Sequence, residues 1–89
     1  MVKIKTFQIK NKLGLHARPA AKLVSVSGQF KSDISFVRKG QEVDGKSILS
    51  LLTLACLKGS RITIRAEGCD ASEAVAALGK VIEEKFGED

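Results

Sequence analysis

The segment Leu13-Gly14-Leu15-His16-Ala17-Arg18-Pro19-Ala20 contains residue types that together can take up and hold a phosphoryl group. His16 is the only histidine of the chain, and an unprotonated imidazole is a competent nucleophile near neutral pH. Arg18 can bind an anion through charge-assisted hydrogen bonds. Gly14 permits a tight turn before the histidine, and Pro19 fits a helix only in its first turn. We therefore expect a helix to begin directly after His16.

The expected helix start supplies further partners for a phosphate. The first backbone N–H groups of a helix have no acceptor within it, and the helix dipole adds partial positive charge there. In this chain those groups belong to Ala17 and Arg18, so an anion on the ring of His16 would meet both. The alternative is a histidine that merely caps a helix. That interpretation does not account for the glycine, arginine and proline that flank it.

The rest of the chain predicts short strands and helices that position this segment. Period-two alternation predicts strands over 2–9, 32–38, 41–44 and 60–67, with a bulge or strand end near Thr6. Helical spacing predicts one helix over 17–27 and two more that begin at Ser47 and Asp70. The order β-α-β-β-α-β-α indicates a single α+β domain over residues 1–89, in which an antiparallel sheet carries the helices on one face.

Two of the expected helices begin with capping patterns. Ser47 is a typical N-cap residue, and Gly59 is expected to end the helix that follows it. The buried stripe of this helix is expected to comprise Ile48, Leu51, Leu52 and Ala55. Asp70 with Glu73 resembles a capping box in which aspartate replaces serine or threonine.

Composition and charge narrow the classes of function. The net charge of +5 favours acidic or phosphorylated partners, but the basic residues are scattered and the chain has no Trp or Tyr for base stacking. No segment has the length of a membrane span or of a signal peptide core. We therefore expect a cytoplasmic protein with no nucleic-acid partner and no membrane insertion. Cys56 and Cys69 lack metal-ligand spacing, and neither a metal nor a cofactor is predicted.

The run from Leu15 to Ala21 resembles the active-site signature of the histidine-containing phosphocarriers, the HPr family of the bacterial phosphoenolpyruvate-dependent phosphotransferase system. The resemblance extends over essentially the whole chain. It implies an open-faced β-sandwich with strand order 1-4-2-3. It also implies that enzyme I phosphorylates His16 on Nδ1, that Arg18 assists at the transferred group, and that a IIA component of a sugar permease receives it. Such a protein is a phosphoryl-transfer intermediate rather than an autonomous enzyme.

A second match to the family is the segment Gly45-Lys46-Ser47-Ile48, which resembles its regulatory serine phosphorylation site. The family then implies a dedicated kinase/phosphorylase as a further partner. From the residues alone, an unmodified N-cap is the favoured interpretation of Ser47, and the family resemblance shifts the balance toward a phosphorylation site. Ile48 and Leu49 are adjacent apolar residues that one helix face cannot bury together, so one of them is expected to remain partly exposed. A wide core stripe would account for both residues, whereas the family resemblance supports an apolar docking patch near His16. Lys22 and Lys46 are expected to add positive charge at its rim.

Two alternatives remain at the level of function. The segment Asn11-Lys12-Leu13-Gly14 and the ending Glu88-Asp89 resemble the nitrogen-related branch of the family, whereas Gly45-Lys46-Ser47 resembles the sugar branch. A small βαββαβ ligand-binding or regulatory domain would have the same order of elements without a phosphorylated histidine. Sugar uptake and its regulation remain the leading hypothesis.

Overall fold

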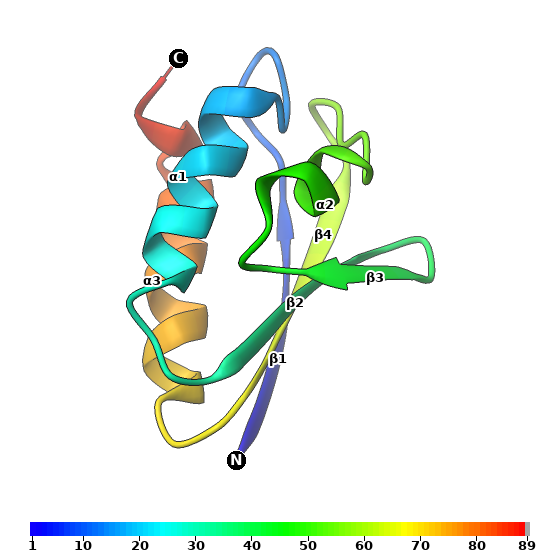
Figure 1. The fold of residues 1–89 in the computed structure, drawn as a ribbon. Coiled ribbons are helices and arrows are strands. Elements are labelled where there is room, and N and C mark those ends of the chain that lie inside the picture. Colours follow the sequence, from blue (N-terminus) through cyan, green and yellow to red (C-terminus); the bar gives the residue numbers. More distant parts are fainter. Residues whose placement is uncertain (89) are drawn as a thin grey trace.

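An antiparallel sheet of four strands forms one layer of the structure, and helices form the other (Figure 1). The computed structural model describes residues 1–88. The strands are β1 (Val2–Gln8), β2 (Asp33–Arg38), β3 (Gln41–Asp44) and β4 (Arg61–Glu67), in the spatial order β1-β4-β2-β3. This confirms the expected fold class, including the strand order that the family resemblance implied.

The helices cover a single face of the sheet. They are α1 (Ala17–Ser27), α2 (Ile48–Leu52) and α3 (Ala71–Glu83), and α3 is followed by the short 3-10 helix η1 (Lys85–Gly87). Figure 1 shows α1 and α3 lying side by side, with α2 beside the start of α1. The C-terminal segment therefore brings Glu88 next to the helix start that follows His16. Figure 1 shows this segment beside α1.

The core lies between the two layers and follows the predicted alternation. Ile62 and Ile64 of β4 and Phe36 of β2 point toward the helices and are fully buried. Leu23 of α1 and Leu78 of α3 meet them from the other layer. The opposite face of the sheet remains open, which matches the polar half of each strand.

Strand β1 contains no bulge, which corrects the expectation at Thr6. It pairs with β4 in an unbroken register from Val2↔Glu67 to Gln8↔Arg61. The apparent change of phase arises because Val2 and Ile4 lie on the open face and are exposed, whereas Phe7 faces the helices and is buried. The apolar side chains on the open face of the sheet thus produced the same hydrophobic pattern that a bulge would produce.

Helix α2 is shorter than predicted, and some of the residues predicted for its buried stripe are exposed. It ends at Leu52, and Ala55 has a left-handed backbone with φ 51°. Ala55 is therefore exposed, while Leu54 is buried. Ile48, which was also predicted for the buried stripe, is exposed as well. Gly59 does not end this helix but lies in the loop that leads to β4, with φ 94°.

Asp70 precedes α3 but does not form the expected capping box. Its side chain makes no cap hydrogen bond. One carboxylate oxygen accepts from the N–H of Lys31 at 2.8 Å, and the other accepts from the N–H of Ser32 at 2.9 Å and from its hydroxyl. These bonds lower the pKa of Asp70, the Ser32 hydroxyl contributing most. Asp70 thus ties the α3 start to the loop before β2.

Candidate functional site

His16 occupies the N-cap position of α1, as the sequence predicted. Its backbone is extended, with φ −88° and ψ −170°, and its side chain makes no cap hydrogen bond. The N–H of Ala20 donates to the carbonyl of His16 at 3.0 Å. Because Pro19 has no N–H, the first turn presents the N–H groups of Ala17 and Arg18 as the donors available to an anion. The first turn carries no acidic residue, so nothing within it opposes negative charge.

The loop before His16 is held by close backbone packing. Gly14 has φ 70° and lies against the Cys56–Leu57 backbone so closely that a Cβ would be 2.9 Å from the Cα of Leu57 and closer still to the carbonyl oxygen of Cys56. That carbonyl accepts from the N–H of Leu15 at 2.8 Å. Burial raises the pKa of the Cys56 thiol, which is free, and the nearby Arg38 charge only partly opposes this. The Gly14 packing and the Leu15–Cys56 hydrogen bond therefore fix the backbone of the loop that precedes His16.

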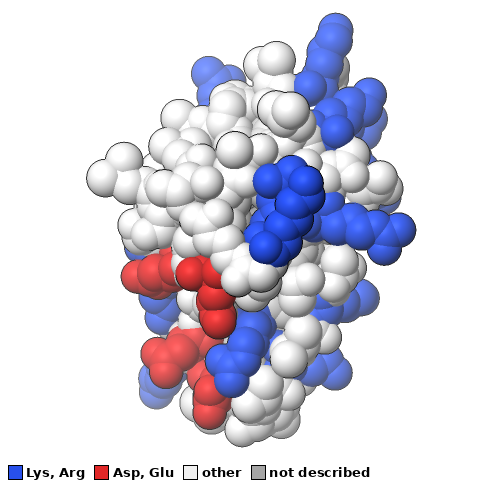
Figure 2. Space-filling view, turned by 90° about the vertical axis from the view of Figure 1, so that its right-hand side faces the viewer, with Lys and Arg blue, Asp and Glu red and all other residues white. Residues whose placement is uncertain are grey.

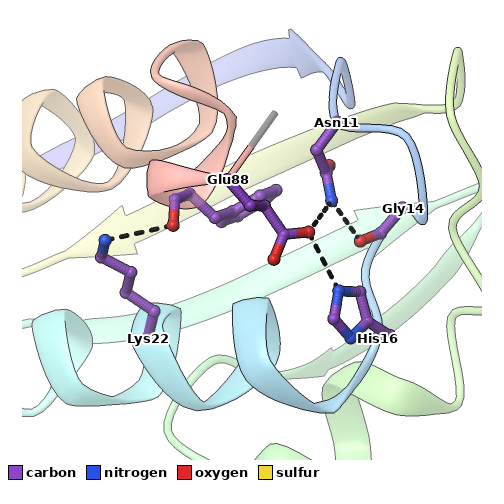
Figure 3. A network of polar contacts seen from close by, with 6 residues as sticks. Asn11, Gly14, His16, Lys22 and Glu88 are labelled. Carbon is purple, nitrogen blue, oxygen red and sulfur yellow. Dashed lines mark hydrogen bonds and ion pairs between the residues drawn. The ribbon is translucent and has the colours of Figure 1, made fainter.

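The C-terminal segment reaches the histidine ring through Glu88 (Figure 3). Its Oε1 lies 2.9 Å from Nε2 of His16 and accepts from Nδ2 of Asn11 at 2.8 Å. The same Asn11 amide donates to the carbonyl of Gly14 at 2.7 Å. The pKa of Glu88 is lowered, first by the hydrogen bond with His16, then by that from Asn11, with a smaller contribution from the charge of Arg18. Asp89 lies outside the described residues.

Two further contacts hold this segment against α1. The aromatic ring of Phe86 is buried although its backbone is left-handed, with φ 57°. Nζ of Lys22 donates to the carbonyl of Phe86 at 3.1 Å (Figure 3). Lys22, which the sequence assigned to partner docking, thus lies on the side of α1 that carries the C-terminal segment. Its exposed side chain adds positive charge there.

Ser47 is the N-cap of α2, as predicted. Its Oγ accepts from the N–H of Ser50 at 3.3 Å, and its side chain is half-buried. The neighbouring Lys46 is exposed, and its Nζ donates to the carbonyl of Phe30 at 3.0 Å. Phe30 follows the C-terminal end of α1, so Lys46 reaches toward the end of that helix that is far from His16.

Both apolar residues predicted for the docking patch are exposed. Leu49 is 78% exposed and Ile48 is 39% exposed. Two other leucines, which the sequence did not single out, are also exposed: Leu13 at 69% and Leu57 at 71%. The Gly14–Leu57 packing puts the loops that bear these two leucines in contact. Exposed apolar side chains thus flank the loop that carries His16.

The site is a surface feature rather than a pocket. The structure does contain an open hollow of about 900 Å³, and its lining includes Arg38, Lys39, Lys58 and Arg61. None of the residues that the sequence assigned to the site lines it. Figure 2 shows the side of the molecule that bears the β2–β3 hairpin, where basic side chains lie mainly at the top, centre and right of the view, a broad uncharged area lies at the upper left, and acidic side chains gather at the lower left. Positive charge is thus concentrated on part of this surface.

Within residues 1–88, no group of three or more His, Cys, Asp or Glu side chains could hold a metal ion. The helices of the same part of the chain are all too short or too polar to cross a membrane.

Sequence reasoning missed the roles of Asn11 and Glu88 at this site. Glu88 is separated from His16 by most of the chain, and only the packing of α3 and η1 on α1 brings the two together. The local sequence predicts that Asn11 is a turn residue, although its side chain is fully buried. A buried asparagine requires hydrogen-bond partners, but Asn11 lies between Lys10 and Lys12 in the sequence, so no local signal marked it as buried.

A half-buried histidine at a helix start, on a four-stranded sheet covered by helices on one face, matches the arrangement expected of the histidine phosphocarriers. The family model of the PTS HPr component phosphorylation site matches residues 3–84, so the chain belongs to the HPr family. It is 46% identical to phosphocarrier protein HPr of Cupriavidus necator over 80 residues, 90% of each chain. It is 39% identical to phosphocarrier protein NPr of Proteus mirabilis over the full length of both chains.

Solved structures agree with this assignment. The crystal structure of HPr-C-His from Thermoanaerobacter tengcongensis superposes with a TM-score of 0.94 at 44% identity, covering 98% of both chains. A phosphocarrier protein HPr from Bacillus anthracis superposes with a TM-score of 0.87 at 42% identity, covering 91% of this chain and 96% of that one. The fold and the family are therefore established together.

Proposed function

We propose that this chain accepts a phosphoryl group on Nδ1 of His16 from enzyme I and passes it to a IIA component of a sugar permease. The observation that carries the proposal is the position of His16 as the N-cap of α1, with the free N–H groups of the first turn beside it. Membership of the HPr family supports the same role. The protein then works in the cytoplasm as a phosphorylated intermediate and not as an autonomous enzyme.

The transfer requires positioning and charge compensation more than covalent chemistry. The lone pair of Nδ1 attacks phosphorus, the bond from phosphorus to the donor's nitrogen breaks, and that nitrogen keeps the bonding electrons. The N–H groups of Ala17 and Arg18 and the Arg18 guanidinium bind the equatorial oxygens. Arg18 is exposed, so it binds the phosphoryl group without enclosing it. Phosphorylated His16 is therefore not stabilised so strongly that transfer to the IIA component is slowed.

Docking is proposed to use the exposed apolar side chains of Ile48 and Leu49, with Lys22 and Lys46 as flanking positive charges. Apolar surface provides short-range affinity, while the lysines speed encounter with acidic partners. Lys46 reaches toward the far end of α1 and is expected to contribute less than Lys22 to contacts close to the phosphoryl group.

Ser47 is proposed as a regulatory phosphorylation site for a kinase/phosphorylase of the HPr type. Its half-buried side chain caps α2 through a bond of 3.3 Å, which is long and easily given up. The helix start tolerates a phosphate at this position, but the phosphate adds negative charge beside the apolar docking residues. It would therefore slow transfer from enzyme I without unfolding α2.

The proposal is tested by incubating the protein with phosphoenolpyruvate and an active enzyme I, then measuring intact mass and acid lability. We expect a gain of one phosphoryl group that is lost in acid and is absent from His16→Ala. No gain, with an enzyme I that phosphorylates another HPr, would mean that the chain retains the site without the relay. A ligand-binding or regulatory domain would then be the better interpretation. The competing nitrogen-type role is distinguished by which IIA component discharges the protein.

A further inference from the structure

The ring of His16 contacts a carboxylate on the side opposite its proposed phosphoryl acceptor atom. Oε1 of Glu88 lies 2.9 Å from Nε2, while Nδ1 lies on the other side of the ring (Figure 3). Among the described residues Nδ1 has no hydrogen-bond partner. The contact is partly shielded from water, because the Glu88 side chain is only 23% exposed and that of His16 is 36% exposed.

The position of the ring proton follows from the donors and acceptors in this cluster. An ionised carboxylate only accepts hydrogen bonds, so the ring nitrogen that faces Glu88 must carry the hydrogen. Asn11 supports the same arrangement, because its amide nitrogen donates to both Glu88 and the Gly14 carbonyl. With the amide reversed, the Asn11 oxygen would face two acceptors. A neutral His16 is therefore protonated at Nε2, which leaves the Nδ1 lone pair free.

We infer that Glu88 is a positioning residue for phosphoryl transfer, which holds the His16 proton on Nε2 and stabilises the positive charge that the ring gains when Nδ1 is phosphorylated. The inference rests on the proposed function of His16. When the Nδ1 lone pair forms the bond to phosphorus, the ring becomes an imidazolium that still carries the Nε2 hydrogen. The carboxylate then faces a full positive charge, so its stabilisation is greater after attack than before. A carboxylate supports the histidine of a serine protease triad in the same way.

The surroundings keep this carboxylate ionised in the working range of pH. His16 and Asn11 bond to it directly, and the Arg18 charge contributes from α1. From the same helix, Lys22 bonds to the carbonyl of Phe86, two positions before Glu88. All of these groups favour the ionised form, which agrees with the lowered pKa of Glu88.

Two substitutions separate the effects of contact and charge. Glu88→Ala removes the contact and is used to locate the ring proton by ¹⁵N NMR of the full-length, unphosphorylated protein. Glu88→Gln keeps an acceptor oxygen but removes the charge, and is used to measure single-turnover phosphorylation by phosphorylated enzyme I. Glu84→Gln is the matched control, because Glu84 is an exposed glutamate at the end of α3 with the same charge. A backbone ¹H–¹⁵N spectrum checks that each variant is folded.

We expect the neutral wild-type ring to carry its hydrogen on Nε2, with exchange of that hydrogen with water accelerated in Glu88→Ala. Glu88→Gln is expected to lower kcat for phosphorylation by about 3- to 30-fold with KM unchanged, the range for a partly exposed charge-assisted hydrogen bond. Glu84→Gln should leave both constants unchanged. A wild-type ring protonated on Nδ1, or a kcat of Glu88→Gln within twofold of that of Glu84→Gln, overturns the inference. If the wild type is not phosphorylated at all, the proposed function fails, whereas the NMR result still tests the contact.

Discussion

The substitution Gly14→Ala tests whether the loop before His16 is held by backbone packing. At Gly14 a side chain faces two separate obstacles. The backbone is left-handed, with φ 70°, and the new Cβ would overlap the Cys56 carbonyl oxygen and lie 2.9 Å from the Cα of Leu57. Both obstacles are backbone atoms of a neighbouring loop, which cannot move aside as a flexible side chain can.

The expected cost is the sum of these two contributions. A left-handed alanine costs about 1–2 kcal/mol, and forcing extra volume into a packed site costs about 1–3 kcal/mol. We therefore expect Gly14→Ala to lower the free energy of unfolding by about 2–5 kcal/mol. The Cys56 carbonyl also accepts from the N–H of Leu15, so any shift that relieves the overlap disturbs the chain next to His16. Phosphorylation should slow even where the protein remains folded.

Gly40→Ala is the matched control. Gly40 also has a left-handed backbone, with φ 82°, but a Cβ there would meet nothing within 4 Å. It should therefore lose only the backbone contribution of about 1–2 kcal/mol, with phosphorylation unchanged. Urea unfolding measures both losses, and single-turnover phosphorylation measures the effect at His16. Equal destabilisation of the two variants, or normal phosphorylation of a folded Gly14→Ala, would refute the account of this loop.

The remaining predictions concern residues on and around the site. Arg18→Ala should lower the phosphorylation rate by roughly 10- to 100-fold, since a hydrogen bond to a charged group contributes about 1.5–3 kcal/mol, while Arg18→Lys should recover part of the loss. Unfolding stability should not change, because Arg18 is exposed. Ser47→Ala should cost about 0.5–1 kcal/mol in urea unfolding, at the low end for an N-cap because its bond is long. Leu49→Ser should raise KM for transfer with stability changed by less than about 0.5 kcal/mol, because Leu49 is 78% exposed. Asp70→Asn should lower the free energy of unfolding near neutral pH and make it depend less on pH in acid. The pKa of Asp70 is lowered in the folded state. The stabilisation by Asp70 is therefore present above its unfolded pKa of about 4 and is lost as pH falls through its folded pKa. Urea midpoints of both proteins at about pH 7 and pH 2.5 provide the comparison.

The local chemistry of the sequence was enough to predict the start of α1 and its candidate histidine. Pro19 restricts the first turn, and the helix spans 17–27 as expected. The alternation of β4 was equally clear, because its inward residues are aliphatic and its outward ones are polar. At both places local propensity and burial agree, which is the condition under which pattern reading succeeds.

The errors occur where long-range packing overrode a local pattern. Ala55 has the spacing of a helical stripe, but the chain turns after Leu52 and places Leu54 in the core instead. Asp70 has the spacing of a capping box, yet its carboxylate bonds to the loop at Lys31 and Ser32. The contact of Glu88 with His16 spans 72 positions of sequence, so no local pattern could have predicted it.

The central claim is that His16 both receives a phosphoryl group and gives it up, and the second step is its most direct test. The protein is charged with ³²P from phosphoenolpyruvate, separated from enzyme I, and mixed with fresh unphosphorylated enzyme I, after which both chains are followed by gel. The account predicts that label moves back to enzyme I faster than it appears as inorganic phosphate, and that His16→Ala never acquires label. Label that stays on the protein until it is hydrolysed would contradict the assignment of His16 as the transfer site of a carrier.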